Sequence, residues 1–372
     1  MTQPTITPIV MPKWGLSMKE GTLAAWHVEE GQTIVPGQEI MDVETDKIAN
    51  AVEAPDGGLL RRRIGEVGLV YPVKALLGVM APAETSDAEI DAFVSDFAVP
   101  TAGGEEDDDG PVHHFVHTPL GRLRYALRPG EGTPTVFVHG FGGDLDNWLF
   151  NIDAAAAAGP AYALDLPGHG GSDKAIAEPG LAGLAEAVAA FMQATGLREA
   201  HLVGHSMGGA VAALVALRGD GLVRGLTLIS PAGLGEEINA AYIDGFVAAE
   251  SRRDLKPVLK DLFADENLVS RQMIDDLLKY KRLDGVPAAL RSLASAMFAG
   301  GRQTTVLADR LAALSIPIQV IWGARDAVIP AAHAKALPKA KVEIIDTAGH
   351  MAMMEAAGRV NDLIRTQTQG AA

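Results

Sequence analysis

The sequence contains no cysteine among its 372 residues, which excludes disulfide bonds and zinc sites built from thiolates. Long apolar runs are also lacking, because the longest alanine-rich stretches, at 154–158 and 210–217, are too short to span a bilayer. The first residues show no basic segment followed by an apolar run, so we expect no secretory signal and a cytoplasmic location.

Positive charge is missing from one stretch of the chain. Between residues 84 and 109 there is no lysine or arginine, and this stretch carries much of the net charge of −16. Its ten acidic residues are Glu84, Asp87, Glu89, Asp91, Asp96, Glu105, Glu106, Asp107, Asp108 and Asp109. Nucleic acid phosphates and anionic membranes repel such a chain, so we expect neither as a partner.

The overall composition, with 48% hydrophobic and 21% charged residues, is that of a soluble globular protein with a large core. Because the length exceeds that of one typical domain, we predict two domains. The larger of the two has room for an inserted cap.

The first 80 residues contain an internal repeat. Gly21 precedes a Glu-Glu-Gly segment that ends at Gly31, and Gly58 precedes a Glu-Val-Gly segment that ends at Gly68, with an offset of 37 residues in both cases. Short runs of Val, Ile and Leu between glycines and prolines favour strands. Two such halves predict a small antiparallel β sandwich with approximate twofold symmetry.

Lys47 falls in the turn that joins the two halves of the domain predicted over residues 1–80. A turn of this kind is exposed, which suits a modifying enzyme that must reach the amine. From spacing alone, an ordinary surface lysine in a hairpin is the alternative.

Residues 81–111 are predicted to form an acidic, flexible linker, because like charges keep such a segment extended and solvated. Four apolar residues within it have helical spacing: Ile90, Phe93, Val94 and Phe97. They could form one short helix that docks on a partner or on either domain, or they could continue the last strand or pack locally.

From residue 112 to residue 372 the pattern alternates between strands and helices and predicts an α/β domain. Apolar runs typical of buried parallel strands occupy 135–139, 161–165, 200–203, 226–229, 318–322 and 342–345. The segment from about 233 to 302 is helical and amphipathic, and it predicts a helical cap over the carboxyl edge of the sheet.

A nucleophile motif, Gly-x-Ser-x-Gly, occupies 204–208 between a strand and a helix, with Ser206 at its centre. A serine hydroxyl needs a base, and His350 follows the last strand, where this fold carries its base. Asp326 follows the preceding strand and can orient the imidazole. The order Ser, Asp, His is the one this fold requires, and we predict Ser206, His350 and Asp326 as the catalytic triad.

A glycine-rich segment at 139–143 follows the first buried strand. The backbone amides of Phe141 and Met207 are predicted to bind a developing oxyanion. Three histidines near the motifs are interpreted as hydrogen-bonding scaffold residues: His139, His169 and His205. The spacing of histidines and carboxylates indicates no metal site, and no phosphate-binding glycine loop is present.

The residues around Lys47 resemble a lipoyl domain. The similarity covers residues 6–80 and includes the segments at 11–18 and 44–47 and three glycines, Gly21, Gly31 and Gly37. Biotin carriers have methionine on both sides of the lysine, whereas Asp46 and Ile48 flank Lys47 here. The resemblance implies that Lys47 carries covalently attached lipoate.

Residues 112–368 are similar to α/β-hydrolases, and the fusion of the two domains resembles the acetyltransferase components of acetoin dehydrogenase complexes. That family implies two partner enzymes, a thiamine-diphosphate-dependent enzyme that cleaves acetoin and dihydrolipoamide dehydrogenase. It also implies coenzyme A as the acyl acceptor. A homo-oligomer is also expected. The chain lacks the His-x-x-x-Asp-Gly motif and the basic subunit-binding domain of ordinary 2-oxoacid dehydrogenase acyltransferases.

The predicted reaction is therefore transfer of an acetyl group from dihydrolipoamide on Lys47 to coenzyme A. Seven cap cations are candidates for its phosphates, or they form a solvated helical face: Arg252, Arg253, Lys256, Lys260, Lys279, Lys281 and Arg282. Two alternatives remain open. One is a serine hydrolase with a lipoyl carrier domain, and the other is a carrier and scaffold in which the second domain is not catalytic.

Overall fold

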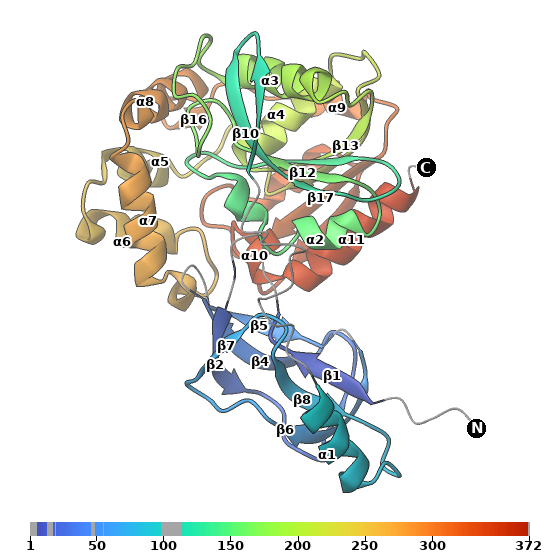
Figure 1. Ribbon diagram of the computed structural model, residues 1–372. Coiled ribbons are helices and arrows are strands. Elements are labelled where there is room, and N and C mark those ends of the chain that lie inside the picture. The colour runs from blue at the N-terminus through green and yellow to red at the C-terminus, as the bar shows by residue number, and fades with distance from the viewer. Residues whose placement is uncertain are drawn as a thin grey trace. The chain divides into compact units, whose positions relative to one another are not determined.

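The computed structural model describes residues 6–12, 18, 20–45, 49–54, 56–97 and 113–370. The chain divides into two compact units, Met1–Pro111 and Val112–Ala372. In Figure 1 the described part of the first unit consists of strands and a helix, and the second is an α/β domain with an additional group of helices. The structure thus has the predicted fold class.

The first unit contains two four-stranded antiparallel sheets. One has the order β1 (Thr7–Val10), β8 (Leu76–Met80), β6 (Gly58–Arg63) and β3 (Thr33–Ile34). The other has the order β5 (Ala49–Glu53), β4 (Glu39–Glu44), β2 (Glu20–Trp26) and β7 (Val70–Pro72). Their apolar side chains form one buried cluster that includes Met11, Leu23, Met41, Leu60 and Leu77. Burial of one face of each sheet is what holds the sandwich together.

The sequence repeat corresponds to a structural repeat. Gly31 and Gly68 have nearly equal positive φ angles of 86° and 87°. The Gly31 amide donates to the Leu60 carbonyl at 2.7 Å, and the Gly68 amide donates to the Leu23 carbonyl at 2.7 Å. Leu60 is the repeat equivalent of Leu23, so the two halves exchange the same hydrogen bonds. This confirms the predicted twofold relationship.

Strands β4 and β5 form a hairpin in which Glu44 pairs with Ala49. Lys47 falls between these two strands in the sequence and lies outside the described residues, as do residues 13–17 of the lipoyl-like motif. Attachment of lipoate at Lys47 therefore stays a prediction from the sequence.

Part of the predicted linker is folded. Residues Asp87–Asp96 form helix α1, which begins with a capping box between Ser86 and Glu89. Ile90 is fully buried against the first unit, and the Arg61 guanidinium donates to the Thr85 carbonyl at 2.8 Å. The described part of the predicted linker is thus folded onto the strands, and the predicted linker start at residue 81 is wrong. Burial of the helically spaced apolar residues outweighs the self-repulsion of its acids.

The second unit contains an eight-stranded sheet with the order β18, β17, β14, β13, β11, β12, β10, β9. The predicted strands appear as β11 (Thr135–Val138), β12 (Ala161–Leu164), β13 (Ala200–His205), β14 (Val223–Ile229), β17 (Ile318–Gly323) and β18 (Lys341–Ile345), and all six are parallel. An antiparallel pair, β9 (His114–Thr118) and β10 (Gly121–Arg128), extends the sheet and was not predicted. Its polar, half-buried residues give no apolar run.

Strand β18 differs from the buried strand expected at 342–345. It is one of the two edge strands of the sheet, and Val342 and Ile344 are 43% and 42% exposed. An apolar run alone does not distinguish an edge strand from a central one.

Helices cover both faces of this sheet (Figure 1). They are α2 (Ile152–Ala156), α3 (Leu181–Ala194), α4 (Met207–Ala216), α9 (Ala308–Ala312), α10 (Ala352–Glu355) and α11 (Ala357–Gly370). Helices α3 and α4 pack together, as do α2 and α11. Among the residues that the structure describes, no helix has the length and apolar character needed to cross a membrane.

Between β14 and β17 lies a group of four helices, which we call the cap. They are α5 (Ala240–Ala248), α6 (Arg252–Lys260), α7 (Arg271–Lys281) and α8 (Val286–Met297), followed by a short hairpin of β15 (Phe298–Ala299) and β16 (Arg302–Gln303). Side chains of Asn239, Ser251 and Ser270 accept amide hydrogens at the starts of α5, α6 and α7. These side-chain hydrogen bonds explain where the three helices begin.

Candidate active site

The turn around Ser206 has an unusual backbone conformation. Ser206 connects β13 to α4 with a φ of 51°, a value that residues other than glycine rarely adopt. A side chain at Gly204 would overlap the carbonyl of Gly208, and one at Gly208 would overlap the carbonyl of Val138. The glycines of the motif are therefore needed because backbone segments meet here without room for a Cβ atom.

His350 and Asp326 lie side by side after β18 and β17. The His350 Nδ1 atom is 2.8 Å from the Asp326 Oδ2 atom, and the two side chains are 2% and 0% exposed. Because a carboxylate only accepts, Nδ1 carries the hydrogen and Nε2 is left as a base. Burial raises the pKa of Asp326, but His350 and the backbone amides of Ile329 and Val328 outweigh it, so this pKa is below its ordinary value.

A tryptophan that the sequence reasoning missed also holds this carboxylate. The indole Nε1 of Trp322, in β17, donates to Asp326 Oδ2 at 2.9 Å, while the amides of Val328 and Ile329 donate to Oδ1 at 2.8 and 2.9 Å. Asp326 is thus fixed by four donors when His350 is counted. The only sequence signal for Trp322 is its place at the end of the strand that precedes the acid.

The glycine-rich segment at 139–143 lies against the serine turn. A Cβ atom built on Gly140 would be 3.2 Å from the Ser206 Cβ atom. Among the described residues, neither the Phe141 amide nor the Met207 amide has a hydrogen-bond acceptor. Both remain available for an oxyanion, as the prediction requires.

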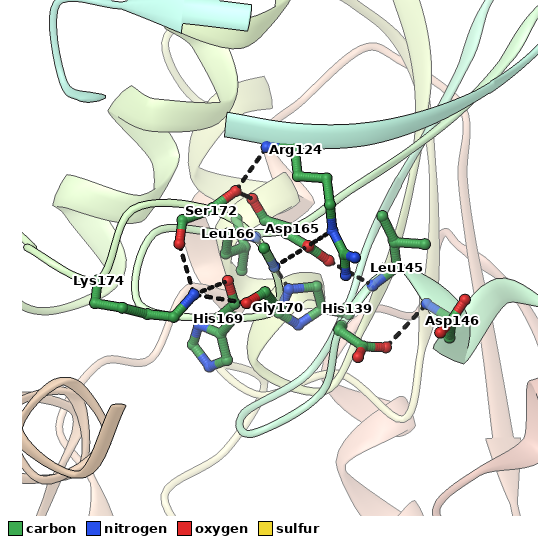
Figure 2. Close-up of polar contacts among 12 residues, drawn as sticks. Arg124, His139, Leu145, Asp146, Asp165, Leu166, His169, Gly170, Ser172 and Lys174 are labelled. Carbon is green, nitrogen blue, oxygen red and sulfur yellow. Dashed lines mark hydrogen bonds and ion pairs between the residues drawn. The ribbon is translucent and has the colours of Figure 1, made fainter. Parts of the chain in front are cut away.

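Behind this segment lies a polar network, shown in Figure 2. Asp165 is fully buried and forms an ion pair with Arg124, and it accepts hydrogen bonds from the amides of Leu145 at 2.8 Å and Gly171 at 2.6 Å. Burial lowers the pKa of Arg124, but Asp165, with Asp144 and Asp146 contributing, more than offsets this, so the pKa of Arg124 lies above its ordinary value. The carboxylate therefore ties the segment after β12 to the segment after β11.

His169 and His139 complete the connection between these two segments. His169 Nε2 accepts the Gly142 amide at 3.2 Å, and His139 Nε2 accepts the Leu166 amide at 3.0 Å. Burial lowers the pKa of His169 to about 3, with His139 contributing, so the ring is neutral and can accept. Lys174 donates to the carbonyls of the turn that carries His169 (Figure 2). Both histidines have scaffold contacts of the expected kind.

His205 precedes the serine and contacts the loop of the predicted base. Its Nε2 atom is 3.0 Å from the His350 carbonyl, and the two rings lie 4.7 Å apart between centroids. Burial lowers the pKa of His205 to about 3, so the ring is neutral and Nε2 donates. The contact brings the serine turn next to the His350 loop.

Most of the cap cations considered as candidates for the coenzyme A phosphates already have partners. Arg252 pairs with Asp275, Lys260 with Glu266, and Lys279 with Asp276. Lys281 donates to backbone carbonyls. Three cations remain exposed without a described ion pair: Arg253, Lys256 and Arg282.

No group of three or more His, Asp or Glu side chains could hold a metal ion within the part of the chain that the structure describes.

Two family models match the chain. The α/β hydrolase fold model covers residues 133–357, and the model for biotin-requiring enzymes, which includes lipoyl domains, covers residues 7–68. A dihydrolipoyllysine-residue acetyltransferase component of the acetoin cleaving system from Cupriavidus necator is 54% identical over 99% of this chain and 98% of its own. This chain belongs to that acetyltransferase family. The corresponding component from Pseudomonas putida is 49% identical over 96% of both chains.

Solved structures resemble the second unit of this acetyltransferase family member. A meta-cleavage product hydrolase from Pseudomonas fluorescens has a TM-score of 0.64 at 20% identity, and covers 70% of this chain and 98% of its own. A membrane phospholipase A has a TM-score of 0.61 at 25% identity, and covers 70% of this chain and 86% of its own. The protein is thus an acyltransferase built on the scaffold of hydrolases.

We expect replacement of Trp322 by Phe to shift the pH dependence of acetyl transfer. The variant keeps an aromatic ring but removes a donor to Asp326, so the pKa of this carboxyl rises and the buried pair loses its carboxylate at higher pH. The acidic limb of kcat/KM should move to higher pH by about one unit, since a hydrogen bond to a charged group contributes about 1.5 kcal/mol. A pH–rate profile measures this. If the acidic limb does not move and the melting temperature is unchanged, the Trp322 hydrogen bond does not set the pKa of this carboxyl.

We expect His169→Leu to lower kcat about tenfold with little change in KM, because the buried Gly142 amide then loses its acceptor, at about 1–3 kcal/mol. His169→Gln can present an oxygen near the Nε2 position and should recover most of the rate. Affinity for a trifluoromethyl ketone, which mimics the tetrahedral state, should fall in parallel with kcat. Equal losses in both variants would contradict positioning through this one acceptor.

Proposed function

We propose that this protein transfers an acetyl group from dihydrolipoamide on Lys47 to coenzyme A through Ser206, His350 and Asp326. The observation that carries the proposal is the presence, in one chain, of a lipoyl domain and a strained serine turn with a buried His350–Asp326 pair nearby. The names of the two full-length relatives support an acetyltransferase component of an acetoin cleaving system.

In the first half-reaction His350 Nε2 accepts the Ser206 proton while Oγ attacks the carbonyl carbon of the acetyl thioester. The amides of Phe141 and Met207 stabilise the oxyanion. The C–S bond then breaks, and the dihydrolipoyl sulfur takes the proton from His350. The acetyl group is left as an ester on Ser206.

In the second half-reaction His350 accepts the proton of the coenzyme A thiol, and the sulfur attacks the Ser206 ester. The bond between carbon and Oγ breaks, and Oγ recovers the proton. Direct attack of coenzyme A on the lipoyl thioester, with His350 as base, is a second route that lacks the serine ester. We assign the exposed Arg253, Lys256 and Arg282 as candidate contacts for the coenzyme A phosphates.

The proposed partner enzymes acetylate the lipoyl group and return it to its oxidised form. A thiamine-diphosphate-dependent component cleaves acetoin and reductively acetylates the oxidised, disulfide form of the arm. After the acetyl group has been transferred, dihydrolipoamide dehydrogenase reoxidises the dithiol. Attachment of the arm to the same chain raises its local concentration to about mM, which offsets weak intrinsic affinity. We also propose a homo-oligomer as the functional form.

The product of the reaction tests this proposal. Purified protein is incubated with free S-acetyldihydrolipoamide and coenzyme A, and both acetyl-coenzyme A and acetate are quantified. The thioester is the expected product. Acetate alone would favour a hydrolase, and the absence of both products would favour a carrier and scaffold.

A further inference from the structure

The cap packs directly on the segment that carries one predicted oxyanion donor. Phe246 of α5 is 2% exposed, and its ring centroid lies 5.8 Å from that of Phe141. A side chain on Gly142 would overlap the Phe246 ring, so this ring touches the backbone there. The backbone of Gly142 is therefore held between His169 on one side and Phe246 on the other.

Lys281 of α7 holds Phe246 in place. Its Nζ atom donates to the carbonyl of Phe246 and, at 3.4 Å, to that of Val247 near the end of α5. The same atom lies 4.9 Å from the centroid of the Phe246 ring. Both carbonyls lie in the last turn of α5, where the carbonyl groups of a helix have no amide donors within the helix. Burial lowers the pKa of Lys281 to about 8 against the opposing effect of Glu250, which fits an amine largely withdrawn from water.

The cap has a second attachment, on the loop of His350. The Met351 amide donates to the Leu262 carbonyl at 3.1 Å. The carboxylate of Glu355 accepts the Ala264 amide at 2.6 Å and the Gly349 amide at 2.7 Å. Residues just after α6 are thus joined to the residues on either side of the base.

A third contact ties α7 to the segment behind the oxyanion donors. The Tyr280 hydroxyl donates to the Gly168 carbonyl at 3.0 Å. With Phe246 and the Glu355 bridge, the cap therefore contacts the surroundings of both the base and the oxyanion donors. His350 itself is only 2% exposed, so bulk water has little direct access to it.

We propose that Phe246, held by Lys281, is a specificity-determining residue that makes the acyl-enzyme react with a thiol rather than with water. The inference rests on the proposed function. The chemistry of the two fates is the same: His350 takes a proton from S–H or O–H, the new bond to carbon forms, and the bond to Ser206 Oγ breaks. The two nucleophiles differ in intrinsic reactivity, and access of water to the ester adds to that difference. Phe246 packs on the backbone beside the Phe141 donor, which is the position from which a side chain limits this access.

The ratio of the two products measures this selection. Wild type, Phe246→Ala, Phe246→Leu and Lys281→Met are each incubated with S-acetyldihydrolipoamide and coenzyme A, and acetate and acetyl-coenzyme A are quantified in the same reaction. Both products arise from one acyl-enzyme, so the ratio does not depend on the acylation rate. The ratio of acetate to thioester should rise about tenfold in Phe246→Ala, a change of about 1.4 kcal/mol in relative barrier height. It should rise less in Phe246→Leu and clearly in Lys281→Met.

Phe191→Ala is the matched control, because it truncates an equally buried phenylalanine in α3 that packs on Tyr125 and Tyr162. It should lower stability without changing the ratio. Titration with a fluorophosphonate counts the competent Ser206 in each sample.

Unchanged ratios in Phe246→Ala and Lys281→Met would overturn the inference. If Phe246→Ala does not fold, Phe246→Leu and Lys281→Met decide it, and the same ratio in both as in wild type overturns it. A wild type that forms no acetyl-coenzyme A would instead refute the proposed function, so the two failures are distinguishable.

Discussion

Ser206→Ala is expected to lower kcat for acetyl transfer by roughly 10⁴-fold or more, because the nucleophile and the base of such a triad act as one unit. Some residual rate should persist, because the Phe141 and Met207 amides still bind the oxyanion. A serine side chain held at a φ of 51° is retained at a cost in backbone strain, which is the kind of outlier found at reacting atoms.

Peptide mass spectrometry distinguishes the covalent route from direct transfer. Wild type quenched in acid after exposure to S-acetyldihydrolipoamide should carry an acetyl increment on the peptide that contains Ser206, and Ser206→Ala should not. The lipoyl increment on the first unit should be equal in both proteins, which controls for modification. A Ser206→Ala variant with an undiminished rate would support direct attack by coenzyme A.

Lys47→Arg is expected to abolish turnover of the assembled acetoin cleaving system while leaving the second unit active. Arginine keeps the positive charge but cannot form the amide with lipoate, so no tethered acyl group is made. Intact mass should show loss of the lipoyl increment, and a reconstituted assay should show no acetoin-dependent acetyl-coenzyme A.

The same variant should still use free S-acetyldihydrolipoamide, because the predicted triad lies on the other compact unit. It should need a donor concentration of about mM or more, the effective concentration that tethering otherwise supplies. Retention of the lipoyl increment in Lys47→Arg would place the attachment on another lysine and contradict the assignment.

Several features of the candidate site could be predicted because they depend on short stretches of chain. The glycines around Ser206 are required by local backbone contacts, so the motif identifies the turn. Asp326 and His350 directly follow two adjacent parallel strands, which brings them to the same edge of the sheet. The repeat that relates Gly31 to Gly68 likewise requires only the order of residues along the chain.

Other features could not be predicted because they join distant segments. Trp322 gives no sign in the sequence that its indole bonds the acid, since that bond depends on how the loop after β17 folds back. Phe246 and Lys281 are ordinary residues of amphipathic helices until the cap packs. The sequence did not decide where helix α1 packs, because a few apolar residues at helical spacing do not show which surface will bury them.

The sequence by itself determined the class of chemistry: a lipoyl-like domain is followed along the chain by a serine turn, with acid and base in the required order. Those signals are local, since each depends on backbone geometry over a few residues or on strand order. Only the tertiary structure decided which groups fix Asp326, which histidine holds the Gly142 amide, and where the cap is attached. These contacts join residues far apart in the chain, and their energies come from burial and hydrogen bonds that exist only after the elements have packed.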